Sequence, residues 1–295
     1  VIWGLDNFFY TDRYLAKTEF SGPVAEQGKF ELITSWSGYS RIKNTYRKDM
    51  TTLEKFIVSE NSQQDTTGFS ALMSRGIYTW QPESEIVALQ LGFDLNHEIG
   101  EGKRIENLTQ EMGDYAGFVS AQYNPIKSLN IQPGFRIAYN TRYKAPVVPS
   151  VNIKWSPVND LALRFSYARG FRAPSLKELY LFFVDINHNV KGNPRLLSEY
   201  ANNLNFSVNF DNEWNNHFYG FELNGFSNLV KDKISLVQDS VDLYTYENIS
   251  NFKSLGINLK LKYKLHPRLI LSFGISETGT LVATNQNSNS DKKYL

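Results

Sequence analysis

A period of two residues dominates the hydrophobic pattern of this chain. In its clearest stretch, residues 255–265, apolar side chains occupy every second position and three lysines lie among the residues between them. Successive side chains of a strand point to opposite faces, so one face of this segment is apolar and the other polar. The same alternation recurs at 87–95, 131–139, 161–167 and 204–210. No helical period is sustained, and the pattern predicts an all-β chain.

The connections between these segments alternate in length from about residue 70 onward. Short ones are rich in Pro and Asn, which favour tight turns: 81–84, 124–127, 156–160 and 266–268. Between them lie long polar ones: 97–114, 141–149, 170–200 and 230–252. Such alternation is typical of an up-and-down antiparallel transmembrane β-barrel, with short turns at one rim and long loops at the other. A soluble β-sandwich also alternates, but charged residues on the polar face of long strands favour a wall around an aqueous lumen.

The barrel interpretation makes two predictions about the faces of the sheet. The apolar sets around five residues are expected to point outward: Leu89, Phe135, Phe165, Phe206 and Leu259. Aromatic residues near strand ends suit the interfacial girdles of a barrel: Tyr10, Trp80, Tyr123, Tyr139, Trp155 and Tyr167.

Composition excludes several classes of protein. The 295 residues carry a net charge of +1 and no Cys, which argues against nucleic-acid binding and excludes disulfides and cysteine metal sites. No run approaches the roughly 18 apolar residues of a membrane helix. The first residues, Val-Ile-Trp-Gly-Leu-Asp, do not resemble a signal peptide. A nucleophile elbow, a phosphate-binding loop and a His-Glu-x-x-His pattern are all missing, so we do not expect an enzyme.

Two short motifs bracket the longest connection. The first is Phe171-Arg172-Ala173-Pro174, which follows an alternating strand; the second is Asn193-Pro194-Arg195-Leu196. In order and spacing these boxes resemble the signature of TonB-dependent outer-membrane receptors. Within the second box segment, residues 192–199, the chain departs from the usual pattern at Arg195 and Ser198. The resemblance is strongest over 113–277.

The resemblance implies a fold. Plugged outer-membrane transporters have about 22 strands, whereas we place about thirteen here, each of roughly 9–11 residues. Residues 1–295 are therefore expected to form a single β-barrel region, an interior segment of a longer receptor whose plug domain and other strands lie elsewhere. The first and last strands should then remain unpaired with each other.

The resemblance also implies a function. It predicts import of a scarce large nutrient (an iron–siderophore complex, haem or cobalamin) across the bacterial outer membrane into the periplasm. The implied partners are the TonB complex, outer-membrane lipid, the nutrient ligand and the plug; nucleic acid is not among them. No cofactor is expected, although haem is a candidate cargo. The alternatives are a structural or adhesive cell-surface β-protein and a secreted carbohydrate-binding β-sandwich.

Candidate site residues lie in and beside the bracketed connection. The residues to which the resemblance gives a structural role are Phe171, Arg172, Ala173, Pro174, Glu178, Asn193, Pro194, Leu196 and Glu199. The candidate ligand contacts are Tyr180, Phe182, Phe183, Asp185 and His188.

Each candidate has two interpretations. His188 is a candidate haem-iron ligand through a neutral imidazole, or a polar loop residue. The aromatic side chains of Tyr180, Phe182 and Phe183 stack on a flat ligand or, as we favour, pack the loop onto the rim. Arg172 and Glu178 form an ion pair at the loop base, or are separately solvated. The charges on the polar faces attract an anionic ligand or, as we slightly favour, pair with the plug: Arg136, Lys154, Arg164, Lys260, Lys262 and Lys264.

Overall fold

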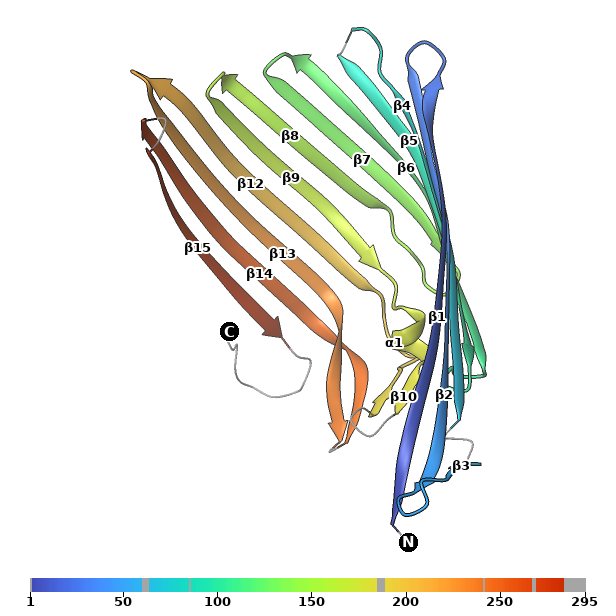
Figure 1. Ribbon diagram of the computed structural model, residues 1–295. Helices are drawn as coiled ribbons and strands as arrows, with labels where there is room; N and C mark the ends of the chain where they lie inside the picture. Colours follow the sequence, from blue (N-terminus) through green and yellow to red (C-terminus); the bar gives the residue numbers. More distant parts are fainter. Residues whose placement is uncertain are drawn as a thin grey trace.

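The computed structural model describes residues 2–59, 64–84, 86–184, 189–240, 242–266 and 269–283. They form one continuous sheet of fifteen strands and a single short helix. The sheet curves like a trough around an inner space, and α1 and β10 lie on its concave side (Figure 1). No helix in these ranges is long and apolar enough to cross a membrane.

The long strands pair in the order in which they occur in the chain. Their bounds are β1 (Trp3–Val24), β2 (Gly28–Asp49), β4 (Asp65–Trp80), β5 (Val87–Gly102), β6 (Thr109–Ile126), β7 (Leu129–Asn140), β8 (Val148–Val158), β9 (Leu161–Arg172), β12 (Glu199–Trp214), β13 (His217–Ser240), β14 (Leu243–His266) and β15 (Leu269–Ala283). The shorter elements are β3 (Lys55–Ile57), α1 (Leu176–Tyr180), β10 (Phe182–Val184) and β11 (Asn189–Lys191). Each pair of neighbouring long strands is antiparallel, which confirms the predicted meander.

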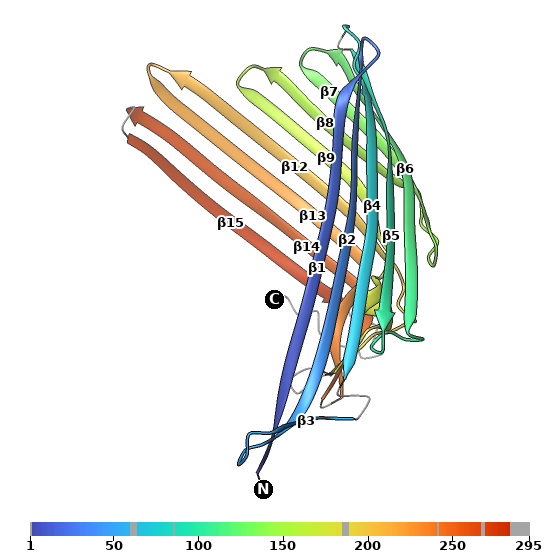
Figure 2. The same ribbon diagram turned by 45° about the vertical axis from the view of Figure 1, so that its right-hand side comes forward.

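The sheet has two free edges. β1 pairs only with β2, and β15 pairs only with β14, so within the described residues the first and last strands do not meet. Figure 2 shows β1 and β15 on opposite sides of the opening. The expectation that these strands remain unpaired with each other is confirmed.

The two rims of the sheet differ as the connection lengths predicted. Tight turns gather at one rim, at the top of Figure 1, and the connections at the other rim include the long segment between β9 and β12. In the β12–β13 turn, Asn215 and Asn216 both have positive φ, 51° and 62°. This conformation matches the right-handed strand twist, and Asn adopts it readily.

The strands are longer than predicted. β13 and β14 each have 24 residues, and β1 and β2 each have 22. The predicted loop 230–252 is therefore mostly paired strand, and the predicted loop 97–114 shrinks to 103–108. The apolar alternation marks only the part of a strand that faces lipid. Backbone hydrogen bonds between strands continue beyond the part that faces lipid. Both faces of the sheet meet water there, so polar side chains suit both.

The apolar residues lie on the convex face and are widely exposed. Phe135, Phe165 and Phe206 are 54%, 37% and 46% exposed. A sandwich would bury these rings between two sheets, so their exposure excludes that alternative and confirms the predicted outward face. Two residues of the expected aromatic girdle, Tyr123 and Trp155, are 45% and 47% exposed and lie near the short-turn rim.

Candidate functional site

The candidate site is the connection between β9 and β12, residues 173–198, which we call the inner loop. It folds back over the concave face of the sheet and contains α1, β10 and β11 (Figure 1). β10 and β11 pair with each other, and β11 adds in parallel to β14. An isolated bridge also joins Leu181 to Ile105, in the connection between β5 and β6. The inner loop therefore spans the trough from one part of the wall to another.

Arg172 joins the two sequence boxes. Its guanidinium donates to Glu199 at 2.7 and 2.8 Å and to Glu178 at 2.9 and 3.2 Å. The predicted ion pair with Glu178 is present, and Glu199 completes it. Two carboxylates match the planar fork of an arginine, whose five donors have fixed directions. The base of the inner loop is thus held at the residues where it leaves and re-enters the sheet.

Arg172, Glu178 and Glu199 form a clamp at the base of the inner loop. Its electrostatics favour the charged forms of Arg172 and Glu199. Hydrogen bonds that Arg172 donates to both carboxylates raise its pKa, with the bond to Glu199 as the largest contribution. Burial opposes ionisation of Glu199, but hydrogen bonds from Arg172 and from the Ile234 amide outweigh it, so the pKa of Glu199 is lowered. The Ile234 bond is 2.6 Å long and ties the clamp to β13.

The helix α1 begins with a capping box. Ser175 Oγ accepts from the Glu178 amide at 3.3 Å, and the Glu178 carboxylate accepts from the Ser175 amide at 2.7 Å. Such reciprocal bonds satisfy two amides that a helix start leaves without partners. The Ser-x-x-Glu pattern was readable in the sequence but was not recognised there. Glu178 therefore serves both the helix cap and the clamp.

A small apolar cluster joins the inner loop to the wall. Leu179, Leu196 and Ile234 are 1%, 3% and 8% exposed, and Tyr143, Tyr180 and Tyr246 pack against them. Burial raises the pKa of Tyr143 to about 12, and its hydroxyl donates to the Leu196 carbonyl at 3.0 Å. Leu196 of the second box is thereby fixed to the β7–β8 connection.

Two residues of the second box segment shape the return of the chain. Gly192 lies so close to α1 that an added Cβ would be 2.6 Å from the carbonyl carbon of Leu179. The Asn193 side chain donates to the Tyr246 carbonyl at 2.9 Å and accepts from the Arg195 amide at 3.0 Å. Gly192 therefore has no room for a side chain, whereas Asn193 uses both the donor and the acceptor of its amide. Pro174 of the first box is fully buried, whereas Pro194 is exposed.

The predicted ligand contacts differ in their surroundings. Tyr180 packs in the cluster, and its hydroxyl accepts from Arg142 at 2.9 Å. Phe182 is 38% exposed, with the Lys191 ammonium 5.4 Å from its ring centre. Asp185, His188 and the side chain of Phe183 lie outside the described residues. The residues that the structure describes hold no group of three or more His, Asp or Glu suited to a metal ion.

Several residues that hold the inner loop were missed by sequence reasoning. Arg142 reaches from the β7–β8 connection to Tyr180, to the Glu111 carbonyl and to Gln110. Asn248 on β14 accepts from the Leu197 amide at 2.8 Å and donates to its carbonyl at 3.0 Å. These partners lie about 30 to 50 residues away along the chain, and nothing in the local pattern marks them.

Four charged residues of the lumen wall pair with one another. Arg136 is joined to Asp94 and lies 3.6 Å from Asp114, and Arg75 lies 3.3 Å from Asp94. Arg136 therefore has carboxylate partners in the wall itself, and pairing of the lumen charges with the plug stays a prediction. Register places these side chains on one face, where neighbouring strands bring them together.

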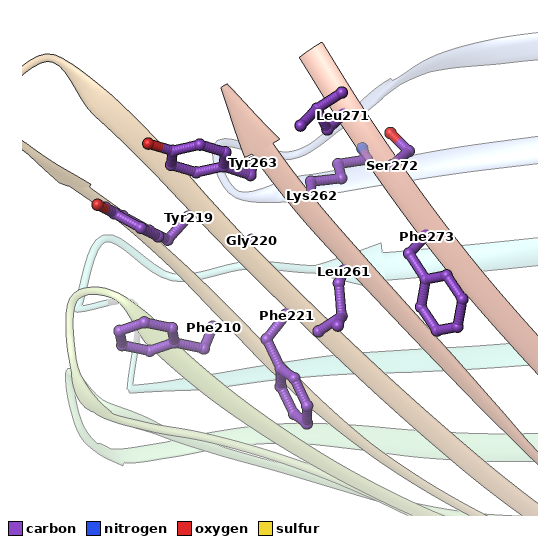
Figure 3. A pocket seen from close by; sticks show the side chains of 10 residues that line it. All are labelled: Phe210, Tyr219, Gly220, Phe221, Leu261, Lys262, Tyr263, Leu271, Ser272 and Phe273. Atoms are coloured by element: carbon purple, nitrogen blue, oxygen red, sulfur yellow. The ribbon is translucent and has the colours of Figure 1, made fainter. Parts of the chain in front are cut away.

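A shallow hollow of about 630 Å³ lies on the opposite face, across β12–β15. Phe210, Phe221, Leu261 and Phe273 face it in one row, and the hydroxyls of Tyr219 and Tyr263 point toward the short-turn rim (Figure 3). The row lies on the apolar convex face, because Phe210 shares the exposed face of Phe206 on the same strand. The hollow suits hydrocarbon and is separate from the lumen.

Comparison with known proteins decides the family. The model of the family "TonB dependent receptor-like, beta-barrel" matches residues 3–295. This chain belongs to that family. Its sheet is accordingly part of the wall of a barrel in the bacterial outer membrane, and the family consists of receptors and transporters.

Solved structures of such receptors share the fold. The siderophore receptor PirA from Pseudomonas aeruginosa has a TM-score of 0.63 and 14% identity, over 92% of this chain and 59% of that one. The outer membrane transporter YddB from Escherichia coli has a TM-score of 0.66 and 12% identity, over 94% of this chain and 43% of that one. The chain thus spans roughly half the length of these receptors.

One curated relative matches a shorter stretch. It is the "Probable hemoglobin and hemoglobin-haptoglobin-binding protein 4" of Haemophilus influenzae, 31% identical over 78 residues. The match covers 26% of this chain and 8% of the relative.

Proposed function

We propose that this chain forms the ligand-facing wall of a TonB-dependent importer of iron chelates, with residues 1–295 acting as one barrel region. The inner loop carries the proposal. It lies across the concave face at the rim with the long connections, and Arg172 holds both of its ends. A loop fixed at its base can present side chains to a ligand that enters the lumen. The residues of the two boxes position this loop, and its remaining residues contact the cargo.

The energy source and the partners that we propose for import are those of the family. Import would require the TonB complex, a plug inside the lumen, and lipid around the convex face. The wall itself supplies closed backbone hydrogen bonding, which a protein needs inside hydrocarbon. An adhesive surface protein would need neither TonB nor a plug.

Two cargo classes have specific support. Solved neighbours are named as siderophore receptors, whereas the curated relative is named for haemoglobin and haemoglobin–haptoglobin binding. His188 in the inner loop is the candidate iron ligand for the haem alternative. The siderophore class does not need that histidine, so the two classes make different predictions for its replacement.

A growth and uptake experiment tests the proposal. The full-length protein is expressed in a host that lacks its own iron receptors, with and without a functional TonB. We expect uptake of labelled iron from a siderophore or haem only when TonB works. Equal uptake in both hosts would reject TonB-dependent import and favour the structural or adhesive alternative. Uptake of neither chelate would reject iron chelates as the cargo.

A further inference from the structure

The half of the β1–β2 hairpin nearest β3 differs in charge between its two faces. Residues 3–13 pair with 39–49, so side chains that lie opposite each other share a face. One face carries Arg13, Arg41, Lys43 and Arg47, with Asp49 at its tip, and the other carries Asp6, Asp12 and Lys48. The hairpin continues well past the level of α1 to the tip where β3 lies (Figure 2).

The cationic face is the one that looks into the trough. Lys177 of α1, which lies on the concave side, places its ammonium 5.1 Å from the ring centre of Phe69. Phe69 is paired with Tyr39, and their ring centres are 6.3 Å apart. Tyr39 is in turn paired with Arg13 on β1. Alternation along β2 then puts Arg41, Lys43 and Arg47 on this same face.

The three arginines on this face each lie over an aromatic ring. Arg47 lies 3.9 Å from the ring centre of Trp3, and Arg41 lies 4.3 Å from that of Phe9. Arg13 lies 5.6 Å from the ring centre of Tyr39. All are within the roughly 6 Å over which a ring quadrupole attracts a cation. A ring holds its cation in place without neutralising the charge.

Carboxylates near this row are engaged elsewhere. Asp49 at the tip accepts from the Thr51 amide at 2.7 Å. Asp65, opposite Lys43, is bound by Arg104 at 2.7 Å through Oδ2, and its buried Oδ1 has no hydrogen-bond partner among the described residues. Lys43 is only 8% exposed and is paired in the sheet with Asp65, so it is not among the cations that a ligand in the trough can reach.

The row ends in a hollow beside α1. The hollow measures about 730 Å³ and is lined by Arg13, Tyr39, Phe69 and Lys177 among others. It also contains Glu98, which accepts from Asn96 at 3.1 Å. Two cations and two rings therefore face one space, with a single carboxylate whose hydrogen bonding is partly satisfied.

We propose that Arg47, Arg41, Arg13 and Lys177 form a cation ladder that conducts an anionic iron chelate with flat conjugated rings from the hairpin tip to this hollow. The inference rests on the proposed import function and narrows its cargo. The charges attract the anion, and the rings beside them provide flat surfaces for stacking. A ferric catecholate and haem share this chemistry, whereas a neutral hydroxamate chelate lacks it.

A matched pair of variants isolates the role of the ladder. Arg47→Gln removes a cation from the concave face, and Lys48→Gln removes one from the adjacent position on the other face. A triple variant, Arg13→Gln with Arg41→Gln and Arg47→Gln, removes three positive charges and retains part of each aliphatic side chain. Association of a ferric tricatecholate, of haem and of a neutral ferric trihydroxamate with the purified full-length protein is followed by fluorescence quenching at low and high salt.

We expect the triple variant to associate about tenfold more slowly with the anionic chelate at low salt, as loss of steering predicts. The difference should vanish at about 1 M salt, where charges are screened beyond about 3 Å. Arg47→Gln should show a part of this effect, and Lys48→Gln less than a twofold change. The chelate that shows the effect, catecholate or haem, identifies the source of the anion.

Three results would overturn the ladder. These are an unchanged rate in the triple variant, equal losses in Arg47→Gln and Lys48→Gln, and an equal loss for the neutral chelate. TonB-dependent uptake of only the neutral chelate by the unmodified protein would reject the ladder but retain the import function. Absence of any TonB-dependent uptake would reject the import function itself.

Discussion

Arg172 and Glu199 face each other at the ends of two neighbouring strands, joined by two hydrogen bonds of 2.7 and 2.8 Å. Arg172 is the last residue of β9, Glu199 is the first of β12, and the two are paired in the sheet. The whole inner loop leaves and returns through this pair. Glu178 adds a third charged group from inside the loop. The clamp thus couples the register of the wall to the position of α1.

Replacing Arg172 with Lys should loosen the inner loop. Lysine retains the charge but not the planar fork that binds two carboxylates. We expect the stability of the loop to fall by about 1.5–3 kcal/mol, the usual range for a hydrogen bond to a charged group. Hydrogen exchange at the Leu179 amide, which bonds to the Ser175 carbonyl at 3.1 Å, measures the loss.

Arg195→Lys provides the control for that experiment, because Arg195 is exposed and its side chain has no partner among the described residues. Its exchange should match the unmodified protein. Equal protection in Arg172→Lys and Arg195→Lys would show that the clamp contributes nothing to loop stability.

The clamp should weaken in acid. The pKa of Glu199 is lowered in the folded protein, so its contribution is complete above the unfolded pKa, about 4.3. That contribution is lost as pH falls through the still lower folded pKa. A spin label on Arg195→Cys, in a chain without other cysteines, should report constant mobility from about pH 7 to 5 and rising mobility below about pH 4.

Glu199→Gln removes the titrating group at the centre of this effect. In that variant the label should already be more mobile at neutral pH and respond less to acid. A pH profile identical to that of the unmodified protein would assign the transition to another carboxylate, and Glu178→Gln would then be the variant to compare.

Two adjacent leucines differ in burial, so their replacement shows how much packing contributes to the stability of the inner loop. Leu196 is 3% exposed and Leu197 is 58% exposed. Leu196→Ala should destabilise the inner loop by about 2–5 kcal/mol, because it leaves a cavity beside Leu179. Leu197→Ala should cost less than about 0.5 kcal/mol, the usual range for surface positions.

Limited proteolysis of the inner loop compares the two leucine variants. Leu196→Ala should be cleaved faster, while heat resistance of the sheet itself stays unchanged in both variants. Equal cleavage rates would contradict the assignment of Leu196 to a buried cluster that holds the loop.

His188 decides between the two cargo classes. If the receptor takes haem through this residue, His188→Ala in the full-length protein should weaken haem binding and shift the Soret band. His217→Ala is the control: His217 stacks on Tyr263 near the short-turn rim, with ring centres 5.8 Å apart. Unchanged binding and spectrum in His188→Ala would remove haem ligation by this residue and favour a siderophore or cobalamin.

The sequence alone predicted the strands, their two faces and the asymmetry of the rims. Residues 255–265 alternate because a strand points successive side chains to opposite sides, whatever its neighbours are. Turn residues such as Pro125 and Pro157 have backbone preferences of their own. The two boxes also located the inner loop, since their order and spacing can be read along the chain. These features are local, so no knowledge of the rest of the molecule is needed.

The tertiary structure alone decided which distant side chains meet. The cation ladder depends on the register of β1 against β2, and the clamp depends on pairing of β9 with β12. Arg142, Ile234 and Asn248 contact the inner loop from connections and strands that have no local mark of this role. The lengths of β13 and β14 were misjudged for a related reason: beyond the lipid zone, backbone pairing with a neighbour maintains a strand without any apolar signal in its own sequence. Contacts of this kind are fixed by register and curvature, which only the assembled sheet determines.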